Sequence, residues 1–131
     1  MISRVHPRLW YATELPSRDV AHALGIQFYL RAVPGVTEAC HIKVVLFAIA
    51  RGIPVLVTNP TWLACIGIHV WGETASEVLK RLHDIPDIDT EAVFRYAGEI
   101  RRPLGEMTDE EFSTLENDLF RGNERQWWGS E

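Results

Sequence analysis

The chain has 131 residues, of which 47% are hydrophobic and 24% are charged. This composition is typical of a globular protein and excludes a disordered one. The net charge is −5 with no basic stripe, so we expect no nucleic-acid partner. The longest apolar run, residues 44–50, is too short to cross a bilayer, so we expect no membrane partner.

The first thirty residues predict short extended pieces around one helix. Residues 2–13 carry β-branched and aromatic side chains interrupted by Pro7, which indicates an edge strand or a pair of short extended pieces. Ser17 is a good N-cap for a helix that ends at Gly25, and residues 26–31 then predict a strand. The apolar positions expected on one face of this helix are Val20, Ala21 and Leu24.

The centre of the chain predicts a helix followed by a buried strand. Residues 37–51 are too long for a strand and end at Gly52, which tolerates a left-handed C-cap. The next residues, 53–57, form a short apolar run rich in β-branched side chains. That pattern is typical of a central parallel strand with both faces covered.

The second half of the chain predicts mostly helices. For residues 61–72 we expect a helical turn near Leu63 and a short strand at residues 68–71. Helices are predicted over residues 74–83, 89–102 and 108–121. Capping boxes are predicted to pair Thr74 with Glu77 and Thr108 with Glu111.

The alternation of strands and helices predicts one α/β domain over residues 1–131. We expect a Rossmann-like architecture, with a small, mostly parallel sheet flanked by helices and with additional C-terminal helices. Residues 1–15 would be an N-terminal extended segment, and residues 123–131 a Trp-rich tail. Since tryptophan is enriched at interfaces, Trp127 and Trp128 indicate a homo-oligomer or a protein partner as one alternative.

The two cysteines point to a reducing compartment. Cys40 and Cys65 lie in apolar stretches without a repeated framework, and the N-terminus lacks the apolar core of a signal peptide, so we expect a cytoplasmic protein. Their proximity in sequence to His41 and His69 raises the hypothesis of a zinc site. The spacing is not that of a zinc finger, and buried core thiols explain it better, so we expect no metal.

One segment carries a resemblance to a known family. The sequence FAIARGIPVLVTNP, followed by TASEVLKRL, resembles the C-terminal, nucleotide-sugar-binding lobe of GT-B glycosyltransferases, in which a helix ending A-x-x-x-G leads into P-V and a buried strand. The matching residues are Ala48, Gly52, Pro54 and Val55. Residues 89–122 also look like the terminal helices of bacterial and phage relatives.

The resemblance implies a nucleotide or nucleotide-sugar ligand. Ligands of open α/β sheets bind beyond the carboxyl ends of the strands, where Thr58, Asn59 and Thr61 follow residues 53–57, and His41 would lie near the start of the preceding helix. Many GT-B proteins place a ribose-binding Glu where this chain has Phe47. The chain has room for one lobe, so it would need a second chain or be catalytically degenerate. No catalytic residue and no cofactor motif is identified.

Overall fold

The computed structural model describes residues 2–30, 38–99 and 108–110, and the statements below refer to these ranges. Four strands form one sheet in the order β1-β2-β4-β3. Strand β1 pairs antiparallel with β2, whereas β2 and β3 each pair parallel with β4, so the sheet is mixed. The bounds of the strands are Ile2–His6 for β1, Leu9–Ala12 for β2, Phe28–Leu30 for β3 and Val55–Val57 for β4.

The N-terminal strands form a hairpin. Two short extended pieces flank Pro7, as one of the two sequence interpretations expected, with a register shift between Arg4 and His6. Of the two hairpin strands, β1 lies at one edge of the described sheet, and β3 lies at the other edge. Strand β2 is internal because Tyr11 pairs with Val57 of β4.

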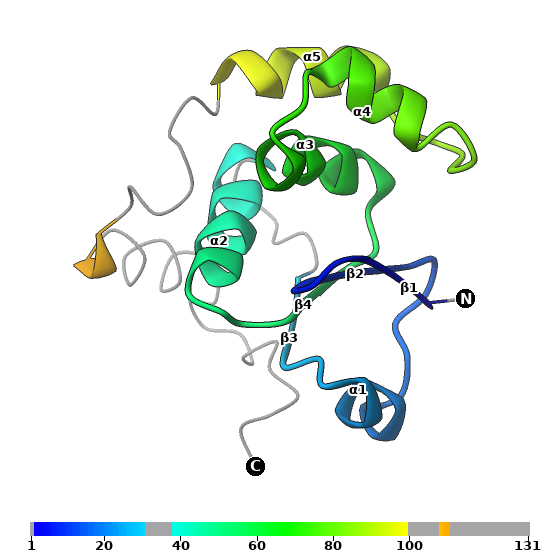
Figure 1. Ribbon diagram of the computed structural model, residues 1–131, viewed down its shortest axis with the longest axis vertical. Helices are drawn as coiled ribbons and strands as arrows, with labels where there is room; N and C mark the ends of the chain where they lie inside the picture. Colours follow the sequence, from blue (N-terminus) through cyan, green and yellow to red (C-terminus); the bar gives the residue numbers. More distant parts are fainter. Residues whose placement is uncertain (1, 31–37, 100–107, 111–131) are drawn as a thin grey trace.

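The helices cover both faces of the sheet (Figure 1). Helix α1 lies on one face, while α2 and α3 lie on the other, and α4 and α5 form a further layer beyond α3. None of the helices in the described ranges is long and apolar enough to cross a membrane. Their bounds are Arg18–Leu24 for α1, Glu38–Ala50 for α2, Pro60–Trp71 for α3, Ala75–Arg81 for α4 and Thr90–Glu99 for α5.

Helix α1 begins and ends as the sequence predicts, but its buried face differs. The Ser17 side chain accepts a hydrogen bond from the Val20 amide, and Gly25 adopts the left-handed conformation at φ 80°. Ala21 is buried as expected, but Val20 is 44% exposed and Leu24 37%, so the prediction was wrong for these two residues. Only Ala21 is buried in this helix, because a seven-residue helix placed over a small sheet contacts it along a narrow line.

Strand β4 is the centre of the structure, as predicted. Its three side chains are fully buried, and they alternate between the two faces. Val55 and Val57 belong to the large core shared with α2 and α3, and Leu56 belongs to the smaller core beside α1. Helix α2 precedes this strand, and Gly52 turns the chain at φ 81°.

The segment after β4 corrects the sequence prediction. Residues 68–71 are not a strand, because a single helix, α3, runs from Pro60 to Trp71. The Asn59 side chain caps it, and Pro60 occupies the first turn, where the missing amide costs nothing. The β-branched and aromatic residues near its end resemble a strand locally, yet burial between layers favours the helix.

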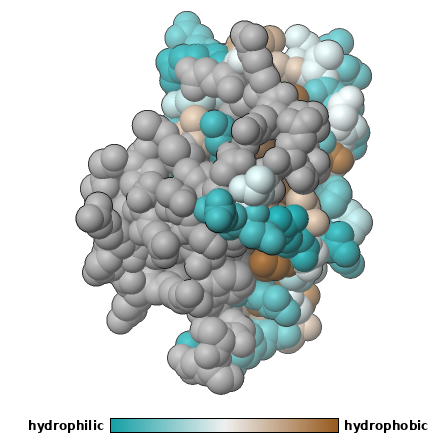
Figure 2. All heavy atoms as spheres, turned by 90° about the vertical axis from the view of Figure 1, so that its left-hand side faces the viewer, coloured by the Kyte–Doolittle hydropathy of each residue, from teal (hydrophilic) through white to brown (hydrophobic). Residues whose placement is uncertain are grey.

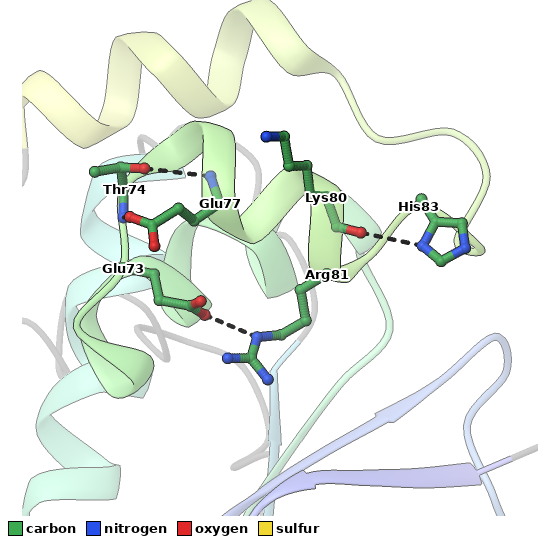
Figure 3. A network of polar contacts seen from close by, with 6 residues as sticks. All are labelled: Glu73, Thr74, Glu77, Lys80, Arg81 and His83. Carbon is green, nitrogen blue, oxygen red and sulfur yellow. Dashed lines mark hydrogen bonds and ion pairs between the residues drawn. The ribbon is translucent and has the colours of Figure 1, made fainter.

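Helix α4 begins at the predicted capping box (Figure 3). The Glu77 amide donates to the Thr74 hydroxyl at 3.2 Å, and the Thr74 amide donates to the Glu77 carboxylate at 3.1 Å. Helix α5 is capped by Asp89, which accepts the Ala92 amide at 3.1 Å. Figure 2 shows many hydrophilic residues at the top of the molecule, at the height of α4 and α5. The last predicted helix falls mostly outside the described residues.

Candidate functional site

The connections of two neighbouring parallel strands leave the sheet on opposite faces. From β2 the chain passes to α1 on one face, and from β4 it passes to α3 on the other (Figure 1). Such a topological switch point is where ligands of open α/β sheets bind, outside the carboxyl ends of the strands. We call the residues that follow these ends, Thr13 and Glu14 after β2 with Thr58 and Asn59 after β4, the switch point.

The switch point presents polar groups from both strands. Thr13 and Glu14 are exposed, and Thr58 and Asn59 are half-buried. The parallel register aligns Tyr11 with Val57, so the residues that follow each of them leave the sheet side by side. Sequence reasoning found Thr58 and Asn59 but missed Thr13 and Glu14, because nothing in the sequence says that β2 is the neighbour of β4.

Asn59 has a structural role at this position. Its Oδ1 accepts hydrogen bonds from the amides of Thr61 at 2.9 Å and Trp62 at 3.2 Å. These two amides are therefore not available to an anion at the start of α3. The Asn59 side-chain NH2 group forms no hydrogen bond with any residue that the structure describes, so a ligand acceptor can still use it.

Thr61 joins two helices. Its side chain is buried, and its Oγ1 accepts the amide of Asp89 at 3.0 Å, just before α5. The loop that contains Asp89 also lies close enough to β2 for the charge of Asp87 to affect the pKa of Tyr11. Burial raises the pKa of Tyr11, and the Asp87 charge raises it further. Thr61 thus holds the loop of residues 84–89 near the carboxyl end of the sheet.

His41 lies deeper than the sequence indicates. It is 1% exposed on α2 and stacks on the Trp62 ring, with centroids 4.9 Å apart and an interplanar angle of 25°. The structure thus brings two predicted residues, His41 and Thr61, to adjoining positions around the first turn of α3. His41 is fully enclosed, so a ligand at the switch point would reach it only after the packing opened.

Trp62 is a further residue near the switch point that sequence reasoning missed. It is almost fully buried, and its Nε1 forms no hydrogen bond with any residue in the described ranges. A buried donor without an acceptor carries a desolvation cost of roughly 1–3 kcal/mol. Because Trp62 lies in the first turn of α3, this unpaired donor is at the same end of the sheet as the switch point. The only sequence signal for it is its position two residues after Pro60, in the first turn of a helix that begins with Asn-Pro.

Among the residues of the zinc hypothesis that the structure describes, the side chains of His41 and Cys65 are buried and that of His69 is half-buried. Cys65 is buried, and burial followed by the Glu38 charge raises its pKa to about 12. Burial lowers the pKa of the half-buried His69. Within the described ranges no three His, Cys, Asp or Glu side chains gather as metal ligands. The Cys40 side chain and the tail with Trp127 and Trp128 lie outside the described residues.

Comparisons with protein-family models, with curated protein sequences and with solved structures found no match. The arrangement of the chain itself is therefore the basis for a functional proposal.

Proposed function

We propose that this chain is a Rossmann-like binding domain that holds a nucleotide or a nucleotide sugar at the switch point. The observation that carries the proposal is the divergence of the chain after β2 and β4 onto opposite faces of the sheet. The described helices on both faces and the parallel pairs β2–β4 and β4–β3 support it. The ligand would lie beyond the carboxyl ends of these strands.

The GT-B resemblance fits this proposal at the level of local structure. Helix α2 contains Ala48, the left-handed turn is at Gly52, and Pro54 precedes the first residue of β4, Val55. Phe47 stands where the ribose-binding Glu is expected. Its side chain is buried, and the Cζ atom of Arg51 lies 3.9 Å from the centroid of its ring. It therefore packs in the core. Catalysis would require a second lobe from another chain.

Polar groups of the switch point match the parts of a nucleotide. The exposed carboxylate of Glu14 is a suitable acceptor for ribose hydroxyl groups, a role that acidic residues have in dinucleotide-binding folds. The Thr58 hydroxyl and the Asn59 NH2 group are donors for phosphate oxygens. In this arrangement the acidic side chain and the neutral donors come from different strands, so the ligand would lie across the pair.

The experiment compares three variants in calorimetric titrations with UDP, UDP-glucose and uridine. Asn59→Asp keeps the acceptor that caps α3 and adds a negative charge. It should weaken binding of UDP about tenfold and leave uridine nearly unchanged, since only UDP carries the repelled charge. Glu14→Gln should weaken all three ligands. Ser76→Ala, on the exposed side of α4, serves as the control.

Two results would contradict the proposal. One is that the unmodified chain binds no nucleotide at millimolar concentration. A thermal-shift screen would test nucleotides with the other bases in the same way. The other is binding that Asn59→Asp, Glu14→Gln and Ser76→Ala all leave unchanged. That second result would keep nucleotide binding but place it away from the switch point.

A further inference from the structure

The β1–β2 hairpin carries a group of basic side chains at the edge of the sheet opposite the switch point. Arg4 and His6 belong to β1, and Arg8 lies in the turn before β2. The amino ends of β2 and β4 meet here, because the Val55 amide donates to the Arg8 carbonyl oxygen at 2.9 Å. Positive charge is thus concentrated on one turn of a chain whose net charge is −5.

The two arginines are held in place by neutral partners. The Nη2 of Arg4 donates to the Pro7 carbonyl oxygen at 2.9 Å, and its guanidinium lies 5.6 Å from the centroid of the Trp10 ring. The Arg8 guanidinium lies against Gly52, where an added β-carbon would be 3.6 Å from its Cζ, Nε and Nη2 atoms. Such restraint reduces the entropy that each side chain would lose on binding a ligand.

The charges of Arg4 and Arg8 are not neutralised by an ion pair with any residue that the structure describes. Arg51, next to Gly52, is different, because it pairs with Asp109 and stacks on Phe47. His6 lies in the positive field: its Nδ1 accepts the Arg8 amide at 3.3 Å, and burial, Arg8 and Arg4 all lower its pKa. The hairpin thus has two guanidinium groups without an ion-pair partner in the described part of the chain, beside an imidazole whose pKa is lowered.

We propose that Arg4, His6 and Arg8 form a binding site for the phosphate group of a small ligand, separate from the nucleotide site proposed above. Guanidinium groups match phosphate oxygens in geometry and charge, and the free Nε2–H of His6 is a third donor. Three basic residues fit one phosphate group. They are too few for a nucleic-acid backbone on an otherwise acidic chain.

The test follows the His6 imidazole by NMR in the full chain, with His6→Gln to identify its signal. Inorganic phosphate and glycerol phosphate are each compared with sodium chloride at equal ionic strength, because salt alone screens the arginines. Bound phosphate should move the His6 titration midpoint upward by about one pH unit beyond the chloride value. A response to inorganic phosphate alone indicates the free anion, and a stronger response to glycerol phosphate indicates an ester.

Charge-matched variants complete the test. Arg8→Gln and Arg4→Gln should each remove the phosphate-specific movement of the midpoint, while Lys80→Gln, which removes an exposed charge on α4, should retain it. Using two arginine variants protects the test against the misfolding of one. An equal movement in phosphate and chloride, or its persistence in both arginine variants, would overturn the proposal. So would tighter binding of a short oligonucleotide with steep salt dependence.

Discussion

Gly67 lets the ring of Trp71 pack directly against the backbone of α3. A β-carbon at this position would lie 2.6 Å and 2.8 Å from the Cζ3 and Cε3 atoms of the Trp71 ring. The Arg81 guanidinium stacks over the same ring at 4.4 Å and binds Glu73 at 2.7 Å (Figure 3 shows this ion pair). The absence of a side chain at Gly67 therefore gives the Trp71 ring the position in which Arg81 of α4 stacks on it.

Gly67→Ala should lower the free energy of unfolding by about 1 kcal/mol, since displacing the Trp71 ring outweighs the gain of up to about 1 kcal/mol in helix propensity. Urea denaturation measures the change. Gly98→Ala in α5 is the matched control, because a β-carbon there meets no atom within 4 Å. It should be stabilising. If both substitutions stabilise the chain, the Trp71 ring is free to move.

His69 makes stability depend on pH. Burial lowers its pKa below the ordinary value of 6.5, so between these two values the unfolded chain binds a proton that the folded chain does not. The free energy of unfolding should therefore fall as the pH falls through 6.5. His6 acts in the same direction, because its pKa is lowered too.

His69→Gln should reduce this pH dependence, as measured by urea denaturation between pH 5 and pH 8, values chosen to span the ordinary histidine range. His83→Gln, which removes an exposed imidazole, is the comparison. An unchanged slope in His69→Gln would show that other groups cause the acid sensitivity.

At the scale of elements, the cap of α3 links stability to the candidate site. Asn59→Ala removes the acceptor for two amides and should cost about 1 kcal/mol of unfolding free energy. Asn59→Asp should cost much less, because aspartate caps a helix about as well. Equal losses in the two variants would mean that Asn59 stabilises the chain by another contact.

The elements also show which sequence signals were reliable. Ser17 and Gly25 bound α1, and Thr74 with Glu77 opens α4, because caps and capping boxes are local and depend on a few neighbouring residues. Helix α3 was predicted only as a turn near Leu63, because Asn59 and Pro60 also indicate the end of a strand and residues 68–71 resemble another strand. Burial of residues 61–67 between layers, a tertiary effect, decides in favour of the helix.

At the scale of the whole molecule, the two faces of the sheet differ in core size. Among the described side chains, the core beside α1 contains four buried residues, whereas the core on the opposite face extends through α2, α3, α4 and α5. The free energy of local opening follows the buried apolar contacts of a segment. The amides of α1 should therefore exchange with solvent at a lower free energy than those of α3. Native-state hydrogen exchange measures this difference, and equal values for the two helices would contradict it.

Only half of the candidate site could be predicted from the sequence, because the other half depends on tertiary contacts. The residues after β4 follow from the buried strand that the sequence predicts at residues 53–57. Thr13 and Glu14 depend on the pairing of β2 with β4, which joins segments more than forty residues apart. Trp62 and His41 meet only when α2 packs on α3. No local pattern specifies such contacts.

The position of β4 between β2 and β3 also has a consequence for synthesis on the ribosome. Strands β1 and β2 can pair as soon as they leave the ribosome. Strand β3 can pair with β4 only after residues 55–57 have been synthesised. Until then one edge of β2 and one edge of β3 expose unpaired backbone groups. A stall in translation before residue 55 would leave a nascent chain with two open edges, which is a form prone to pairing with other chains.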